Sequence, residues 1–435
     1  MKESVADRLS TDYKNLSERF TKQTKNFTKQ YCSIYTVRLG KMRNLLKNRI
    51  KKKWGEQYPI CELHKLSEND YPKCIVVGTL FKDQKLKPSV LKQLAEANSL
   101  VPQPVYTHYT DDSDTLFIED ELQRFQMIGD IDKASLVTGI SCALLGRDLG
   151  QGKFEVEDYC FADFQPQIER PLLEDDMYVI FISGLDLVHF QKVSPSLQIF
   201  CSWVSGFFGN INDIDVSKIV RLVIAGNSTK IVHEKIKTTM SLTSRATELP
   251  EVIESVKLFD SLLLELAQVI EVDVMPGEHD PSNHVLPQQV MHHCMFPKSM
   301  MYKSLNQVPN PYECQIGGVR ILGSSGQPVT NILGFCDIQE PIDALERCLK
   351  WSHIAPTAPD TLGCYPFYDN DPFVIENCPH VMFAGNQEKF STKLCKGEDG
   401  QEVRLMCIPE FANTFTVGVL NLKNLNCIPV SLRIL

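Results

Sequence analysis

Apolar residues recur at three- and four-residue steps from Tyr31 to Trp54. This spacing places them on one face of a helix of about six turns, and Gly55 stands where such a helix would end. We assign Arg38 and the lysines and arginines that follow it to the opposite face. The pattern therefore predicts a long amphipathic helix that packs its apolar face on a neighbouring domain.

The stretch from Cys74 to Phe164 changes to short apolar runs broken by glycines and by the acidic turn TDDSDT. These runs predict four or five strands, and residues 88–98 predict one short helix. Four or five strands and one helix in roughly 90 residues are typical of a small Greek-key barrel of the OB type. The barrel sequence is rich in Asp and Glu and has few paired aromatics, which does not favour DNA binding by its face.

Strands and helices alternate beyond the proline-rich, charged linker at 165–176. Continuous apolar runs such as 177–184 predict buried strands, and the periodic run at 248–270 predicts a helix. Strand–loop–helix units of this kind form layered α/β domains whose sites lie on the loops after the strands.

Three parts follow from these patterns. We predict a flexible N-terminal tail at residues 1–28, a basic helix with an OB-type barrel at 29–170, and a layered α/β domain at 171–435. The fold class is accordingly mixed, α+β in the barrel part and α/β in the layered part. At 435 residues the chain is long for a single core, which agrees with two domains.

Charge is distributed unevenly along the chain. Residues 22–53 contain eleven Lys and Arg and no Asp or Glu; because the whole chain carries −9, the remainder must carry −20. The run Lys51, Lys52 and Lys53 is a candidate nucleic-acid contact or nuclear-import signal, and the alternative is a solvated helix face. No apolar window of 18 residues and no apolar signal core occur, so we expect neither a membrane-spanning helix nor a secretory signal.

The fifteen cysteines are scattered singly and include no Cys-x-x-Cys pair. This argues against a zinc ribbon or an iron–sulfur cluster and predicts reduced thiols, most of them buried. The run His292-His293-Cys294 contains ligand-type side chains, but no spaced partner pair accompanies it. We therefore expect it to be a surface loop.

The segment VDVMPGEHDPSNH, residues 272–284, runs from a buried-strand pattern into Pro-Gly and then Glu278, His279 and Asp280. It resembles the strand-end loop Gly-Asn-His-Asp of calcineurin-like phosphoesterases. In that family five strand-end segments supply the carboxylates, amide and imidazoles that hold two cations and activate a water. Segments in the same order occur here, so the resemblance implies a phosphoesterase-type layered domain.

The ligand side chains of that family are replaced at most of these segments. Asn227 stands where a bridging Asp is needed, and a neutral amide cannot offset the repulsion between two dications. We therefore expect no catalytic residue, no metal and no cofactor. The residues at the degenerate metal-site positions are Ser183, Leu185, Asn227, Glu278, His279, His353, Asn386 and Glu388.

An OB barrel ahead of a phosphoesterase-type domain without its ligands is the arrangement of the B subunits of the eukaryotic DNA polymerases alpha, delta and epsilon. This chain resembles that family, and most closely its delta branch, over nearly all residues after 25. The distinctive segments include QYCSIYTVRLGKMRNLLKNRIKKKWG, GKFEVEDYCFADF and HIAPTAPDTLGCYPFYDNDPF. His279 departs from the pattern, because the family leads us to expect a non-catalytic residue such as Phe there.

The resemblance implies a non-enzymatic accessory subunit of DNA polymerase delta in the nucleus, serving DNA replication and repair. Its implied partners are the cysteine-rich C-terminal module of the catalytic subunit and the third subunit. Polymerase zeta is implied to share it, and DNA is met through the complex. The segment Thr357–Pro379, rich in Pro, Asp and aromatics, is either an exposed contact surface or a loop packed on its own domain.

Two other functions stay open from the residues. One is a weak metal-dependent phosphodiesterase that uses Glu278, His279 and His353. The other is an independent single-strand DNA-binding protein, in which the basic helix supplies the electrostatic contact.

Overall fold

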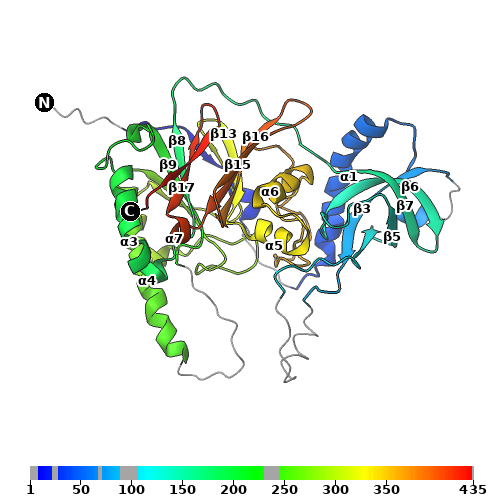
Figure 1. Cartoon of the computed structure of the whole chain (residues 1–435), viewed down its shortest axis with the longest axis horizontal. Coiled ribbons are helices and arrows are strands. Elements are labelled where there is room, and N and C mark those ends of the chain that lie inside the picture. The colour runs from blue at the N-terminus through cyan, green and yellow to red at the C-terminus, as the bar shows by residue number, and fades with distance from the viewer. Residues whose placement is uncertain (1–7, 22–27, 67–70, 89–105, 230–243, 434–435) are drawn as a thin grey trace. The chain divides into compact units, whose positions relative to one another are not determined.

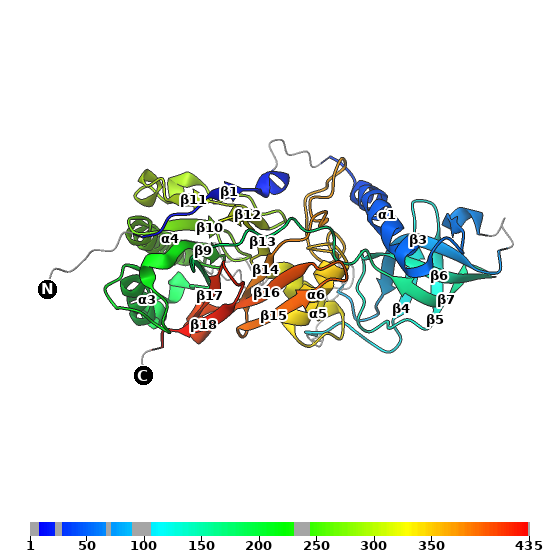
Figure 2. The same ribbon diagram turned by 90° about the horizontal axis from the view of Figure 1, so that it is seen from above.

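The computed structural model describes most of the chain; for residues 244–250 it describes the backbone only. The described residues are 8–21, 28–66, 71–88, 106–229 and 244–433. They form two compact units, drawn in Figures 1 and 2. Unit 1 consists of Met1–Lys25, Gln167–Gln327 and Pro379–Leu435. Unit 2 consists of Asn26–Pro166 and Pro328–Cys378.

The chain passes between these units four times, because their segments alternate along the sequence. The compact units group residues 328–378 with the barrel, whereas the sequence placed them in the layered domain at 171–435. The boundary that we predict near residue 170, between the barrel domain and the layered domain, stays a prediction.

Unit 2 contains the barrel. Its strands are β2 (Ile60–Cys61), β3 (Cys74–Asp83), β4 (Thr115–Glu119), β5 (Arg124–Gly129), β6 (Ser141–Gly150) and β7 (Lys153–Cys160). The sheet order is β2-β3-β4-β5-β7-β6, and β3 also pairs with β6, so β3 to β7 close on themselves. β5 and β7 are parallel, which is the strand arrangement of an OB barrel. The predicted strands are confirmed, and the helix predicted at 88–98 lies outside the described residues from 89 onward.

Helix α1 (Cys32–Trp54) is the amphipathic helix expected from the sequence, and Gly55 ends it with φ of 66°. Its apolar face packs on the barrel strands β3 and β6. Every fourth residue of one stripe is buried: Ile34, Arg38, Met42, Leu46, Ile50 and Trp54. The predicted helix is confirmed, but our placement of Arg38 on the solvent face is wrong, since four-residue steps put it in the apolar stripe.

Arg38 is fully buried and is held by groups from distant parts of unit 2. Its Nε donates to Asp371 Oδ2 at 2.7 Å, Nη1 to Pro356 O at 2.9 Å, and Nη2 to Ala358 O at 2.6 Å. Burial alone would raise the pKa of Asp371, but the Arg38 guanidinium and His353, whose Nε2 lies 3.0 Å from Asp371 Oδ2, hold that pKa well below its usual value. The ion pair therefore fastens residues 355–373 to helix α1.

The segment Thr357–Pro379 is mostly buried, with Cys364, Phe373 and Val374 among its enclosed side chains. The expectation of an exposed contact surface is therefore wrong for most of the segment. The segment is packed, but within unit 2 and not in the layered domain to which the sequence assigned it. Two helices precede the segment in unit 2, α6 (Pro341–Lys350) and α5 (Gln327–Phe335), whose first residue still belongs to unit 1.

Unit 1 is built on two six-stranded sheets. The first has the order β1-β12-β13-β14-β16-β15, and the second β11-β10-β9-β8-β17-β18. The first sheet comprises β1 (Tyr13–Asn15), β12 (Tyr312–Ile316), β13 (Val319–Ser324), β14 (Val381–Gln387), β15 (Ser391–Lys396) and β16 (Glu402–Pro409). The second comprises β8 (Tyr178–Ile182), β9 (Ile219–Ala225), β10 (Glu271–Met275), β11 (Leu305–Gln307), β17 (Thr416–Asn421) and β18 (Cys427–Ser431).

The core of unit 1 has two layers. One lies between the sheets, where Phe181 packs on Phe383 with ring centroids 5.0 Å apart. The other lies under α3 (Phe190–Val204), α4 (Ser244–Ala267) and α7 (Phe411–Thr414), which cover the second sheet, as Figure 1 shows for α3 and α4. The predicted layered architecture of mixed sheets and helices is confirmed.

Residues 8–20 are part of unit 1, so the predicted flexible tail is wrong for this stretch. β1 pairs antiparallel with β12, beside which it lies in Figure 2, and Phe20 is buried. The Tyr13 ring lies 3.8 Å from the Arg221 guanidinium, which binds the buried Asp273 at 2.6 Å. A three-residue strand is too short to show a period, which is why the sequence pattern missed it. Residues 1–7 and 22–27 lie outside the described residues.

All fifteen cysteines are reduced, as predicted, and only Cys32 and Cys294 are exposed. No described helix has the length and apolar character needed to cross a membrane.

His380 joins two segments of unit 1. Its Nδ1 accepts the Arg320 N–H at 2.8 Å, and its Nε2 lies 2.8 Å from Ile168 O, so the neutral ring uses both nitrogens. Burial lowers the pKa of His380 below its ordinary value of 6.5, and Arg170 and Arg320 add to this effect.

The first prediction concerns the Arg38–Asp371 pair. Asp371→Ala leaves a buried guanidinium without its counter-ion, so the free energy of unfolding should fall by about 3–5 kcal/mol. The exposed pair Lys41–Glu376, with 2.6 Å between Nζ and Oε1, also joins α1 to this segment and supplies the matched control. Glu376→Gln should change stability by less than about 1 kcal/mol. Urea unfolding of each full-length variant measures both, and equal losses would contradict the assignment.

The second prediction concerns pH. Because the folded-state pKa of His380 lies below 6.5, the unfolded chain binds more protons in the window below that value. The stability contributed by the neutral ring is complete above pH 6.5 and is lost as the pH falls below it. His380→Gln should flatten this fall in thermal-unfolding midpoints. An unaltered slope in His380→Gln would exclude the histidine as its source.

Candidate functional site

The carboxyl ends of parallel strands meet in unit 1. In the second sheet β8, β9 and β10 are parallel neighbours, and in the first sheet β13 and β14 are parallel. A backbone hydrogen bond of 2.9 Å from Gly184 N to Gly226 O joins the loops after β8 and β9. This edge is where an α/β fold places its site.

Asn227 connects the loop after β9 to the loop after β10. Its Oδ1 accepts the His279 N–H at 3.0 Å, and its own backbone has φ of 57°. The two loops touch closely, because a Cβ on Gly277 would lie 2.4 Å from Asn227 N. Only glycine fits at residue 277, and Asn is among the residues that tolerate a left-handed backbone.

Asp280 is buried in the same loop, and both of its carboxylate oxygens accept hydrogen bonds there. Oδ1 accepts the Thr229 N–H at 2.9 Å and the Thr229 hydroxyl at 3.0 Å, and Oδ2 accepts the Gly277 N–H at 2.9 Å. Burial raises the pKa of Asp280, while these donors favour its charged form. The carboxylate therefore holds the two loops in place.

Asn386, in β14, spans the two sheets. Its Nδ2 donates to Ala225 O at 3.1 Å and to Ser325 O at 2.8 Å, and its backbone N–H donates to Ser183 Oγ at 2.9 Å. The residue has φ of 56°, and its Oδ1 faces Gly184, where a Cβ would lie 2.9 Å away. Ser183 Oγ in turn donates to Pro409 O at 3.1 Å.

The structure thus brings together four of the predicted positions: Ser183, Asn227, Asn386 and the backbone of His279. Amide and hydroxyl groups bond one another across the strand ends. Such neutral donors and acceptors cross-link the loops and supply no strong cation ligand.

The other predicted positions do not join this cluster. Leu185 packs in the helix-side core. Glu278 and Glu388 are exposed. His353 belongs to unit 2, where its Nε2 contacts Asp371.

A second polar group beside these loops was missed at the sequence level. Gln288 donates to Gly277 O at 2.9 Å, and its Oε1 accepts from Asn310 and from Gln327, both at 2.8 Å. The signal was weak, because isolated amides in loops are common. Here the three amides are packed together, and Gln288 fixes the loop after β10 through its hydrogen bond to Gly277 O.

The Lys51–Lys53 run lies at the C-terminal end of α1. Lys53 Nζ lies 2.6 Å from Asp158 Oδ1 of β7, and Lys51 Nζ lies 2.8 Å from Glu56 Oε1. Further along the helix Arg43 pairs with Glu121 at 2.7 Å. Basic helix residues therefore face acidic barrel residues, which accounts for part of the uneven charge. A nucleic-acid or import contact at Lys51–Lys53 stays a prediction.

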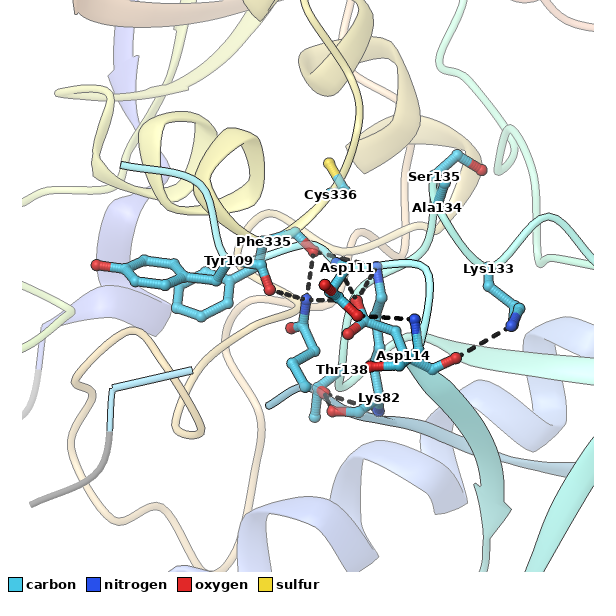
Figure 3. A network of polar contacts seen from close by, with 12 residues as sticks. Lys82, Tyr109, Asp111, Asp114, Lys133, Ala134, Ser135, Thr138, Phe335 and Cys336 are labelled. Atoms are coloured by element: carbon cyan, nitrogen blue, oxygen red, sulfur yellow. Dashed lines mark hydrogen bonds and ion pairs between the residues drawn. The ribbon is translucent and has the colours of Figure 1, made fainter. Parts of the chain in front are cut away.

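Figure 3 shows a buried polar network in unit 2, centred on Lys82 and Asp114. Lys82 Nζ donates to Phe335 O at 3.3 Å and lies 3.6 Å from Asp114 Oδ2, which also accepts from Gln84 at 3.1 Å. Burial lowers the pKa of the Lys82 amine, and the Asp114 carboxylate partly offsets this. The network fixes the end of α5 to strand β3, so its role is structural.

Comparison with known proteins agrees with this architecture. The family of the DNA polymerase delta subunit OB-fold domain matches residues 30–159, and the family of the B subunit of DNA polymerases alpha and epsilon matches residues 179–392. "DNA polymerase delta subunit 2" of Drosophila melanogaster is 38% identical over 423 residues, 97% of this chain and 98% of the relative.

Plant and yeast proteins are similar over comparable lengths. The "DNA polymerase delta small subunit" of Arabidopsis thaliana is 39% identical over 98% of this chain and 96% of its own length. The Saccharomyces cerevisiae protein of the same description is 30% identical over 94% and 91%.

An OB barrel joined to a two-sheet unit with these matches defines the class of DNA polymerase B subunits. Within that class, the chain belongs to the DNA polymerase delta small-subunit family. The resemblance predicted from the sequence is confirmed, as is the OB-type barrel.

The third prediction tests the strand-end cluster. Asn386→Ala removes the donors to Ala225 O and Ser325 O and places a less tolerant residue at φ of 56°. Two buried carbonyls lose a partner, so the free energy of unfolding should fall by about 1–3 kcal/mol. Glu388→Ala, two residues on and exposed, is the matched control and should stay within about 0.5 kcal/mol. Equal stability of both variants in denaturant titration would show that the Asn386 side chain does not stabilise the strand-end cluster.

Proposed function

We propose that this chain is the non-catalytic accessory subunit of a DNA polymerase delta complex. The observation that carries the proposal is the similarity of 38–39% that extends over nearly the whole chain and nearly the whole of relatives named as delta subunits. Both units are covered by this similarity.

We propose further that the two-sheet unit is a phosphoesterase-type domain that has lost its metal ligands. Three features support this: the strand ends meet as in a metal site, left-handed residues gather there, and neutral side chains occupy the key positions. Asn227 and Asn386 bond to the protein itself, where a phosphoesterase would need ligands for two cations. On this reading the hydrogen bonds replace the metals as the cross-links of the loops.

The proposed partners follow from the membership of the chain in the DNA polymerase delta small-subunit family. This protein binds the cysteine-rich C-terminal module of the polymerase catalytic subunit and, through another surface, the third subunit. It acts in the nucleus in replication and repair, meets DNA through the assembled enzyme, and is shared with polymerase zeta. The fifteen reduced and mostly buried cysteines are compatible with a reducing compartment such as the nucleus.

The fourth prediction tests the assembly. Co-expression of the full-length chain with the catalytic subunit of DNA polymerase delta should give a stoichiometric complex that co-elutes in size-exclusion chromatography. Removal of the cysteine-rich C-terminal module from the catalytic subunit should abolish co-elution. Separate elution of the two intact polypeptides would contradict the proposal.

The same purified chain tests the phosphodiesterase alternative. Any hydrolysis of a phosphodiester in the presence of Mn²⁺ should be equal in the wild type and in His279→Ala, because background hydrolysis does not depend on that side chain. A rate that falls in His279→Ala while complex formation persists would show a working site and overturn the non-catalytic assignment.

A further inference from the structure

His292, His293 and Cys294 place two imidazoles and one thiol together on the surface of unit 1. One ligand atom of each side chain lies within 4.8 Å of those of the other two, and all three residues are exposed. Throughout the described part of the chain, this is the one group of three or more His, Cys, Asp or Glu side chains with such spacing. The sequence predicted an ordinary surface loop here.

The backbone that carries the three side chains is well fixed. They lie at the 3-10 turn His293–Met295, between Met291 and Phe296, which are both buried. Phe296 packs edge-on against Phe259 of α4, with ring centroids 5.6 Å apart, and its N–H donates to His293 O at 3.0 Å. The two apolar anchors turn inward, so the polar side chains between them remain at the surface. The His292 and His293 rings lie close together, with centroids 4.3 Å apart.

This donor set selects a class of ion. Imidazole nitrogen and thiolate sulfur suit Zn²⁺ and similar ions, whereas Mg²⁺ and Ca²⁺ take oxygen ligands. Tetrahedral zinc holds its nitrogen and sulfur ligands at about 2.0–2.3 Å, which places the donor atoms about 3.3–3.8 Å from one another. Small rotations of exposed side chains cover the difference from the observed spacing. We propose that His292, His293 and Cys294 form a three-ligand site for Zn²⁺ or a similar transition-metal ion, with the fourth position open.

One hydrogen bond competes with the metal. His292 Nδ1 accepts the Cys294 N–H at 3.3 Å, which caps the turn. Coordination through Nδ1 replaces this bond directly, and coordination through Nε2 moves the ring proton to Nδ1 and breaks it as well. The bond is long, so its loss weakens binding only modestly. Because the thiol must lose its proton to bind, metal affinity should rise with pH.

The open fourth position allows the bound ion to take one further ligand. Three protein ligands hold the ion, and water or a side chain of a bound protein completes the shell. The site is separate from the strand-end cluster, because none of its three side chains takes part in the hydrogen bonds of that cluster.

The fifth prediction is a Co²⁺ titration of the untagged full-length chain in a phosphine reductant, followed by absorbance. Co²⁺ replaces Zn²⁺ in tetrahedral sites and reports a thiolate ligand by a charge-transfer band in the near ultraviolet. The wild type should bind one equivalent with this band, and Zn²⁺ should displace it. Cys294→Ser should abolish the band, and His292→Gln and His293→Gln should each weaken binding at least about tenfold. Cys32→Ser, at the other exposed cysteine, is the matched control and should retain the band.

Two results would overturn the site. One is a wild-type titration without a charge-transfer band, and the other is a band that persists in Cys294→Ser. Circular dichroism of each variant confirms that it is folded, so a lost band then reports the ligand and not the fold. Neither result bears on complex formation with the polymerase, so the two proposals fail separately.

Discussion

The assembly of unit 2 depends on satisfying one charge that has no contact with water. The Arg38 guanidinium has Asp371 as its counter-ion and backbone carbonyls at Pro356 and Ala358 as further acceptors. An unpaired buried guanidinium is far too costly to tolerate, so helix α1 and a segment more than three hundred positions away must come together for either to be stable. Hydrophobic packing alone would let this segment shift along the helix, whereas directional hydrogen bonds fix one register.

At the strand ends of unit 1, buried polar groups, most of them neutral, are satisfied by hydrogen bonds in the same way. Asn227, Asn386 and Ser183 satisfy carbonyls and amides of neighbouring loops, and Asp280 is consumed by Thr229 and Gly277. In a metal site these positions would be occupied by ligands whose mutual repulsion only a cation relieves. Here the loops hold one another directly. The protein therefore keeps the arrangement of the strand-end loops through hydrogen bonds among its own side chains and backbone.

The regular elements were largely predictable, since α1, the barrel strands and the buried strands of unit 1 follow hydrophobic periodicity. Arg38 was readable too, because it stands four residues from Ile34 and from Met42, within the apolar stripe. The ordered N-terminal strand was not, because its partners, β12 and Arg221, lie far away in the sequence, and no local pattern encodes such pairings. At the strand ends the sequence showed which side chains occupy the loops. Their mutual hydrogen bonds depend on left-handed backbones that only the folded chain reveals.

The alternation of the two units along the chain has a practical consequence for anyone who maps partners by deletion. A fragment that stops before residue 328 removes residues 328–378 from the barrel unit, and one that begins after residue 166 removes β1 from the two-sheet unit. Each such cut damages the unit it was meant to isolate, so lost binding would report misfolding as readily as a missing interface. Surface substitutions in the intact chain are the appropriate tool, and a genetic fusion that carries both segments of unit 2 is the smallest piece that respects its architecture.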